Sequence, residues 1–565
     1  MTSHQRIPAA VGGLFAAAAG LGLGELTAAL AGGTSPVVGV GTQMIDLAPG
    51  PLKDWAVKNL GTADKPILVG GVLVAVAVFA MAAGVIGLKR PRVALGMTVL
   101  LGLLAILAAA TGRSLATNGV VRVLPGVITL LVATAGMYLV LRSRGYSLRG
   151  SRKQPPEADA TATSSLTTTG SPTSGASATA GQAAGAEIAG TEAGTETAGA
   201  HAAIPEAEAP SGFDRRKFLV TTFALGAVGA GGAVVSRVLP GGVDEATRRA
   251  IRIPAAASRA KVLPAGVAAN VAGVSPFVTP NKSFYRVDTL LTVPKVDPRN
   301  WELRVHGMVD RELRLNFADL LNRRLVERDI TLTCVSNEVG GPYVGNARWI
   351  GVPIAEILRE AGVQAGADAV KSTSVDGLTI GTPLQALTDG RDALFALGMN
   401  GEPLPFDHGF PVRMVVPGLY GYVSATKWIV DFEVTRFDDF SAYWTDRGWA
   451  VEAPIKTASR IDVPKGFARV KPGPAVAAGV AWAQHRGIAK VEVQVDDGPW
   501  QEAQLADEAG IDIWRQWTFR WNATSGNHTL TVRATDKTGQ VQTADRAAPR
   551  PNGSSGLHNT VVMVE

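Results

Sequence analysis

The chain has 565 residues, of which 46% are hydrophobic and 18% are charged, so it carries less charge than an ordinary soluble protein. Its mean hydropathy is +0.17 although aromatic residues make up only 6%, because the apolar content comes mainly from Ala, Val, Leu and Gly, as in transmembrane helices. The net charge of +6 is small for this length, and no dense basic stretch carries interleaved aromatic residues, which disfavours nucleic-acid binding.

Four apolar segments open the chain, at residues 7–32, 67–88, 93–111 and 120–141. Each is near the ~20 residues that a helix needs to cross the hydrocarbon of a bilayer. We therefore expect residues 1–145 to contain four transmembrane helices in contact with the lipid bilayer.

Basic residues set the predicted topology of this multi-pass cell-membrane protein. Lys89, Arg90 and Arg92 lie between the second and third segments, and a second basic cluster follows the fourth, at residues 142–153. The positive-inside rule places both clusters, and with them the N-terminus, in the cytoplasm.

Residues 146–212 consist mainly of Ala, Thr, Ser, Gly and Glu, with almost no large apolar side chain. Such a composition buries too little surface to offset chain entropy, so a disordered cytoplasmic linker is predicted.

Residues 213–240 combine Arg215, Arg216 and Phe218 with a fifth apolar stretch rich in Gly and Ala. This pattern indicates either a twin-arginine-like export signal or an ordinary membrane anchor with its positive end inside. Both interpretations place all later residues outside the cytoplasm.

The remaining sequence is long enough for two domains. Strand-like runs alternate with short helical patterns in residues 241–450, which predicts an α+β domain. Residues 451–565 instead contain alternating strand runs, at 491–495, 517–521 and 529–533, separated by Gly-containing turns. Strands at this spacing predict an all-β sandwich.

Cys334 is the only cysteine, which excludes an internal disulfide, a CxxC redox pair and a cysteine-rich zinc site. A solitary cysteine is most often a small buried hydrophobic residue. This one ends an apolar strand run and precedes the Gly-rich residues 338–342, so the strand would deliver its thiol to a polar loop. A soft thiolate in such a place suits a metal whose other ligands belong to a cofactor.

Cys334 and the following motif at residues 345–353 resemble the sulfite oxidase family of molybdenum enzymes, and the resemblance covers roughly residues 270–565. Further motifs follow in the order of the family, at residues 399–405, 407–413, 416–418 and 426–428.

The resemblance implies molybdenum held by the Cys334 thiolate and by the dithiolene sulfurs of one molybdopterin. It also implies cofactor contacts at Tyr285, Arg286, Asp376, His408, Arg413, Ala425, Thr426 and Lys427. Arg, His and Lys on loops around one pocket supply donors for a pterin edge and cations for its phosphate, whereas each residue taken alone is equally an ordinary capped or solvated side chain. The C-terminal segment resembles the family's immunoglobulin-like dimerisation domain, which implies a homodimer.

Two departures from animal and plant sulfite oxidases concern the substrate. Residues 337–339 replace the region of their post-cysteine arginine, and Trp449 aligns with their active-site tyrosine. An indole donates a hydrogen bond but cannot act as acid or base. Lys456 is a candidate for restoring a cation at the pocket mouth, with a surface lysine as the alternative. The catalytic candidates are therefore Cys334, Trp449 and Lys456.

None of the seven histidines lies in an apolar segment, and no CxxCH motif exists. We therefore expect no haem in this chain and a separate electron-transfer partner, either a cytochrome or a membrane redox protein.

The sequence thus predicts a membrane-anchored, extracytoplasmic molybdenum oxidoreductase that transfers an oxygen atom to or from a small substrate. A sulfoxide reductase that runs the same site in reverse is the nearest alternative. A cofactor-free, membrane-anchored adhesion or scaffold protein is the alternative from another class.

Overall fold

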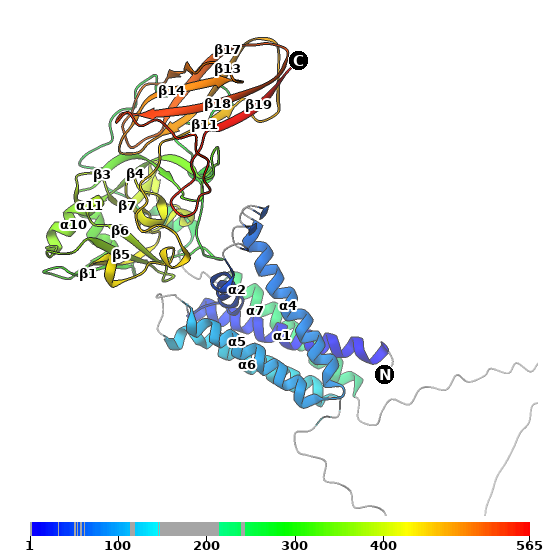
Figure 1. Cartoon of the computed structure of the whole chain (residues 1–565). Coiled ribbons are helices and arrows are strands. Elements are labelled where there is room, and N and C mark those ends of the chain that lie inside the picture. The colour runs from blue at the N-terminus through cyan, green and yellow to red at the C-terminus, as the bar shows by residue number, and fades with distance from the viewer. Residues whose placement is uncertain are drawn as a thin grey trace, which may run out of the picture.

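The computed structural model describes residues 3–31, 33–49, 52, 55–56, 59–60, 63–112, 119–144, 146, 214–238 and 243–565. Apart from Tyr146, the predicted linker lies outside the described residues. The chain comprises a helical region up to residue 238, a central region of residues 243–450 and a two-sheet region of residues 451–565 (Figure 1).

The helical region contains helices α1 (Ser3–Ala31), α2 (Pro36–Leu47), α4 (Asp64–Gly87), α5 (Pro91–Thr111), α6 (Gly119–Arg142) and α7 (Arg215–Val238). All of these except α2 are long and apolar enough to cross a membrane, and they coincide with the five apolar segments of the sequence. The region is therefore compatible with a membrane location.

Helix α1 lies at the centre of the bundle and packs on α4, α6 and α7 (Figure 1). Glycines permit this close approach: a Cβ on Gly229 of α7 would lie 2.7 Å from the carbonyl oxygen of Ala18, and one on Gly20 would lie 2.7 Å from the Cβ of Ala133. Small residues at such crossings allow membrane helices to gain van der Waals contact along their backbones.

Two sheets form the central region. The first has the order β2-β1-β10-β5-β6, and in the second, β3-β4-β7-β8, strand β9 also pairs with β7. The strands of the first sheet are β1 (Glu302–Gly307), β2 (Leu313–Asn316), β5 (Ala369–Ser374), β6 (Thr379–Pro383) and β10 (Ile429–Thr435). Those of the second are β3 (Val326–Thr333), β4 (Val344–Pro353), β7 (Leu394–Met399), β8 (Glu402–Pro403) and β9 (Arg413–Val415). The helices are α8 (Glu245–Ala250), α9 (Phe317–Leu321), α10 (Ile354–Ala361), α11 (Gln385–Thr388) and α12 (Gly421–Ser424).

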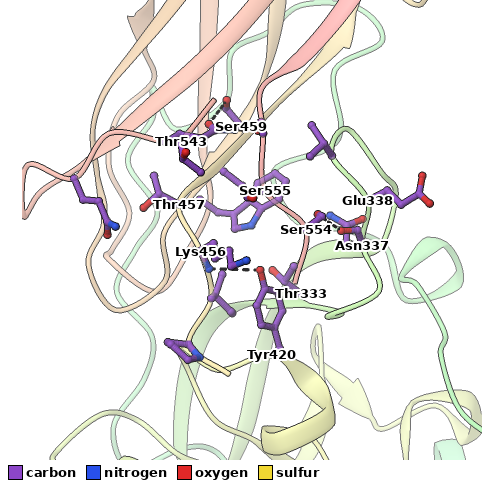
Figure 2. A pocket seen from close by; sticks show the side chains of 18 of the residues that line it. Thr333, Asn337, Glu338, Tyr420, Lys456, Thr457, Ser459, Thr543, Ser554 and Ser555 are labelled. Carbon is purple, nitrogen blue, oxygen red and sulfur yellow. Dashed lines mark hydrogen bonds between the residues drawn. The ribbon is translucent and has the colours of Figure 1, made fainter. Parts of the chain in front are cut away.

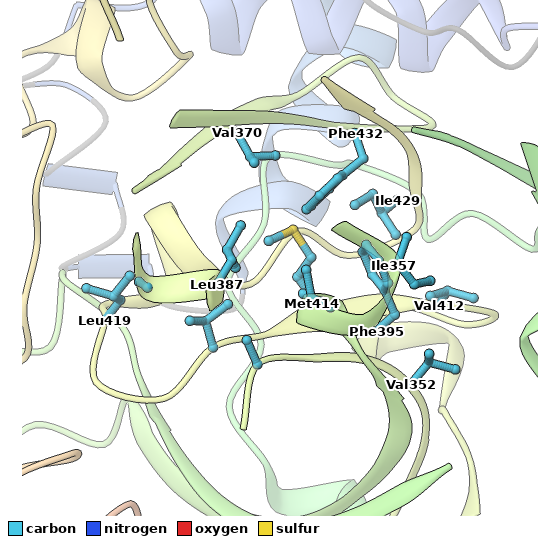
Figure 3. Packing of buried hydrophobic residues seen from close by; sticks show 14 of the residues in the cluster. Val352, Ile357, Val370, Leu387, Phe395, Val412, Met414, Leu419, Ile429 and Phe432 are labelled. Atoms are coloured by element: carbon cyan, nitrogen blue, oxygen red, sulfur yellow. The ribbon is translucent and has the colours of Figure 1, made fainter. Parts of the chain in front are cut away.

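The core of the central region lies between these sheets (Figure 3). Phe432 of β10 and Phe395 of β7 meet edge to face with ring centroids 5.1 Å apart, and Met414 of β9 belongs to the same cluster. Helix α10 adds Ile357 because its apolar side chains share one face, and the left-handed Gly362 (φ 71°) ends the helix.

The two-sheet region has sheet orders β11-β13-β17-β16 and β12-β19-β18-β14-β15. Its strands are β11 (Ala458–Val463), β12 (Ala468–Val470), β13 (Gly473–Trp482), β14 (Ile488–Val495), β15 (Gln501–Glu502), β16 (Gln504–Leu505), β17 (Arg515–Ala523), β18 (Gly526–Asp536) and β19 (His558–Val564). Both sheets contribute alternate side chains to one core, including Trp517 and Val532. The three predicted strand runs fall within β14, β17 and β18.

Candidate functional site

The thiol of Cys334 lies just beyond the end of β3. The backbone N–H of Cys334 donates to the Tyr343 carbonyl (3.0 Å), and Sγ lies 2.9 Å from Ser336 Oγ. The residue is only 9% exposed. Burial raises the pKa of the thiol, and the hydrogen bond to Ser336 opposes this rise in part.

Cys334 lines a cavity of about 140 Å³ that has mostly apolar walls. The structure brings the following predicted residues into the lining: Tyr285, Asp376, His408, Arg413, Ala425, Thr426, Lys427 and Trp449. They come from different strand ends and loops, so the fold rather than the local sequence assembles the pocket. Arg286 lies beside it, with its guanidinium paired to Asp288 (2.7 Å) and Asp407 (3.1 Å).

Lys427 is the lysine of the pocket. Its Nζ lies 2.7 Å from Asp288 Oδ2, and burial lowers its pKa to about 8 against the attraction of that carboxylate. Asp288 also contacts Arg286 and Lys65, the latter at 2.6 Å. Burial alone would raise the pKa of Asp288, but the three cations hold it well below its usual range.

Arg413 begins β9 and is buried. Its guanidinium donates to the carbonyls of His408 (3.1 Å) and Ala425 (3.5 Å), and Cζ lies 5.2 Å from the ring centroid of Trp349. Burial lowers its pKa to about 10, so it remains a cation at neutral pH. Carbonyl oxygens and a ring face are its partners here, which leaves its positive charge available to an anionic group.

His408 is neutral at neutral pH because burial lowers its pKa to about 4. Its Nε2 lies 2.9 Å from the Asn281 carbonyl and therefore carries the proton as the donor. The remaining ring nitrogen, Nδ1, is consequently a hydrogen-bond acceptor in a side chain that lines the pocket.

The other polar side chains of the lining are fixed locally. Thr426 Oγ1 and Ser372 Oγ are 2.7 Å apart, and the carboxylate of Asp376 accepts a short hydrogen bond from the Ser374 hydroxyl. Burial and the nearby Cys334 raise the pKa of Tyr285 far above its ordinary value, so its phenol stays protonated.

An aromatic wall closes the pocket on one side. The ring centroid of Trp449 lies 5.7 Å from that of Tyr422 and 6.5 Å from that of Trp444. The Nε1 of Trp449 is buried and has no hydrogen-bond partner among the described residues. Because an unpaired buried donor is costly, this N–H is suited to bind a ligand in the pocket.

Lys456 lies in a second cavity, of about 400 Å³, between the central and two-sheet regions (Figure 2). Its Nζ donates to Asn552 Oδ1 (3.1 Å) and to the Gly553 carbonyl (2.6 Å). Lys456 thus lines this second cavity, where acceptors from a distant loop bind its ammonium, and the role expected for it at the mouth of the Cys334 pocket stays a prediction. Asn337 and Tyr420 line the same second cavity.

Asp288 is the residue that sequence analysis missed. The sequence contains a signal for Asp288, because an acid two positions after the candidate cation Arg286 is close enough to form an ion pair with it. Its contacts with Lys427 and Lys65 depend on the tertiary fold.

Comparisons with known proteins agree with this geometry. Residues 290–444 match the family described as oxidoreductase molybdopterin binding domain. Mitochondrial sulfite oxidase of Mus musculus is 30% identical over 336 residues, which cover 50% of this chain and 60% of that protein. Sulfite oxidase of Arabidopsis thaliana is 28% identical over 289 residues, which cover 42% of this chain and 72% of that protein.

Among solved structures, the sulfane dehydrogenase SoxCD of Paracoccus pantotrophus is 22% identical with a TM-score of 0.46, over 52% of this chain and 84% of that one. The match to the mouse sulfite oxidase spans 60% of the length of that protein.

The pocket and the domain match define a molybdopterin-binding oxidoreductase. Residues 290–444 match the molybdopterin-binding family and the chain is similar to sulfite oxidases, which implies a molybdenum-molybdopterin cofactor. The donor set fits this group, because a buried thiol, two buried cations and several neutral donors and acceptors meet in one cavity. An enzyme is therefore supported in place of an adhesion or scaffold protein.

Proposed function

We propose that this protein is a membrane-anchored, extracytoplasmic molybdenum oxidoreductase that transfers an oxygen atom to or from a small substrate. The observation that carries the proposal is the placement of the Cys334 thiol in one cavity with Arg413, Lys427 and His408. A buried thiol that shares a cavity with two cations and several polar side chains is typical of a cofactor site, because burying such groups costs free energy.

The residues divide the binding of the cofactor among them. The Cys334 thiol would hold the metal as a thiolate, because a bound metal ion would favour loss of its proton despite the raised pKa of the thiol. Arg413, Lys427 and Arg286 attract the phosphate. Neutral groups, among them His408 Nδ1 and the Thr426 hydroxyl, bind the edge of the pterin.

When bound, the cofactor supplies a molybdenum centre that changes oxidation state as an oxygen atom is exchanged with the substrate. The protein orients the substrate and excludes water. Trp449 donates its free indole N–H to an oxygen of the substrate but takes no proton. Because the wall around it is aromatic and Lys456 points into another cavity, the site favours a neutral or larger substrate over a small dianion such as sulfite.

The positions of charged residues support the proposed orientation in the membrane. Lys65 lies at the start of α4 and contacts Asp288 of the central region, whereas Lys89 and Arg90 follow the other end of that helix. The basic cluster expected in the cytoplasm is thus at the opposite end of α4 from the central region. We therefore place residues 243–565 outside the cytoplasm, with α7 as a twin-arginine-like signal that is kept as a membrane helix.

The proposal also includes two partners. A separate cytochrome or membrane redox protein exchanges electrons with the site, and a second copy of the chain binds through the two-sheet region, which we interpret as immunoglobulin-like. Both sheets of that region enclose one core, as in such sandwiches.

Elemental analysis of the purified full-length protein tests the central proposal. We expect about one molybdenum atom per chain in the wild type, a loss of most of it in Cys334→Ser, and retention in the control Ser525→Ala, which removes an exposed hydroxyl of the two-sheet region. Sulfite oxidation and sulfoxide reduction, each measured with artificial electron carriers, then establish the direction and substrate. Wild-type protein without molybdenum would refute the proposal.

A further inference from the structure

Two sets of contacts join the helical region to the central region on the side where α2 and the start of α4 lie (Figure 1). In the first, Lys65 Nζ lies 2.6 Å from Asp288 Oδ1. In the second, the Tyr443 hydroxyl donates to Asp46 near the end of α2 (2.8 Å), and Arg447 lies 3.9 Å from the same carboxylate.

The first contact reaches the cofactor pocket through one carboxylate. Asp288 is 4% exposed in its side chain and accepts from Lys65 on Oδ1 and from Lys427 on Oδ2. Lys427 lines the pocket, and its side chain is 11% exposed. The two lysines therefore share this buried carboxylate with Arg286, so that a displacement of Lys65 changes the charge environment of Lys427.

The second contact reaches the opposite wall through aromatic rings. The guanidinium of Arg447 lies 3.5 Å from the ring centroid of Tyr443, and Tyr443 meets Trp444 edge to face at 4.9 Å. Trp444 in turn contacts Trp449, and both tryptophans line the pocket. Asp46 thus fixes the first ring of a chain of packed side chains that ends at the pocket.

We propose that Lys65 and Asp46 are positioning residues of the active site, so that the helical region sets the placement of Lys427 on one wall and of Trp449 on the other. The helical region is then a structural part of the pocket in addition to being an anchor. This inference rests on the proposed function, because it assigns the pocket to a molybdopterin cofactor and its substrate.

The first test uses the full-length protein extracted from membranes. Lys65→Met is compared with Lys65→Arg, which keeps the charge, and with Lys89→Met, which removes a lysine just beyond the other end of α4. Because second-sphere partners of a metal site commonly change its affinity by tenfold or more, we expect Lys65→Met to lose molybdenum to a chelator about tenfold faster than the wild type. Lys65→Arg and Lys89→Met should retain it as the wild type does.

Equal retention in Lys65→Met and Lys89→Met would overturn the role of Lys65. A wild type without molybdenum would instead refute the proposed function, so the two failures are distinguishable. A single symmetric peak in gel filtration verifies that each variant is folded. If Lys65→Met fails this criterion while Lys65→Arg does not, release of molybdenum from Lys65→Gln, which removes the charge but keeps a polar side chain, gives the same comparison.

The second test concerns Asp46 and needs no change in the pocket itself. Asp46→Ala and Tyr443→Phe should each raise KM about threefold or more with little change in kcat, because a displaced wall weakens substrate binding. The double variant should be no worse than either single variant, since both remove the same hydrogen bond. Additive effects, or an unchanged KM, would overturn the role of Asp46.

Discussion

The ammonium of Lys427 and the carboxylate of Asp288 lie 2.7 Å apart, and their side chains are only 11% and 4% exposed. Breaking a buried ion pair by removing one partner leaves an uncompensated charge in a poorly polarisable environment. The pair therefore ties the charge of Lys427 to a carboxylate that also lines the pocket.

Asp288→Asn should lower the pKa of Lys427 below its present value of about 8, because burial then acts without the opposing carboxylate. We expect Lys427 to be mostly neutral at pH 8 and the protein to lose cofactor and stability, the latter by about 3 kcal/mol. Molybdenum content and the melting temperature measure the two effects. The control is Asp407→Asn, since Asp407 contacts Arg286 from an exposed position. Similar losses in both variants would contradict this prediction.

Trp449→Phe removes the unpaired indole N–H and keeps an apolar ring. We expect kcat/KM for the preferred substrate to fall about tenfold, as for one lost hydrogen bond of about 1.4 kcal/mol. Trp449→Tyr should raise the turnover of sulfite relative to other substrates. Trp521→Phe is the control, because Trp521 also has an unpartnered Nε1 among the described residues but lies in the two-sheet region. Efficient sulfite oxidation that is insensitive to changes at Trp449 would exclude a role for this residue in specificity.

His408 should make the central region sensitive to acid. Its pKa of about 4 in the folded protein lies below the value of about 6.5 in an unfolded chain, so the unfolded state binds the proton more readily between these values. The contribution of neutral His408 to the free energy of unfolding is therefore complete above pH 6.5. It is lost as the pH falls towards 4, and the loss is at most about 3 kcal/mol. His558, with a pKa of about 4 from burial, adds a second contribution of the same sign.

Melting temperatures at pH 7.5 and pH 4.5 provide the measurement for His408. His408→Gln keeps an N–H donor for the Asn281 carbonyl but does not titrate, so its melting temperature should fall less on acidification than that of the wild type. Protonation of His558 should account for part of the fall that remains. Identical losses in the two proteins would show that His408 is not buried and neutral.

Protease added to spheroplasts should digest residues 243–565 and leave the linker intact, because the basic clusters place the linker in the cytoplasm. Changing Arg215 and Arg216 together to Lys keeps the charge and removes the arginine identity. This variant should accumulate with its C-terminal part protected if the twin-arginine interpretation is correct. Normal exposure of that part would leave α7 as an ordinary anchor.

Sequence alone predicted the features that depend on local pattern. Hydropathy located the five long apolar helices, and the family resemblance carried by the ordered motifs named many of the residues that line the pocket. It did not predict the pair of Lys65 and Asp288, whose members lie 223 positions apart, since no periodicity connects them. The partners of Lys456 were not predicted for the same reason, because charge alone does not specify which distant carbonyl binds an ammonium.

The packing of α7 on α1 has a consequence for how the protein tolerates change. Gly229 contacts Ala18, so α7, the last of the long apolar helices, packs directly against α1, the first. The position of α7, and with it the start of the central region, is therefore set by contact with α1 although the two helices are far apart in the sequence. A single bulky side chain at Gly229 would therefore push α7 away from α1.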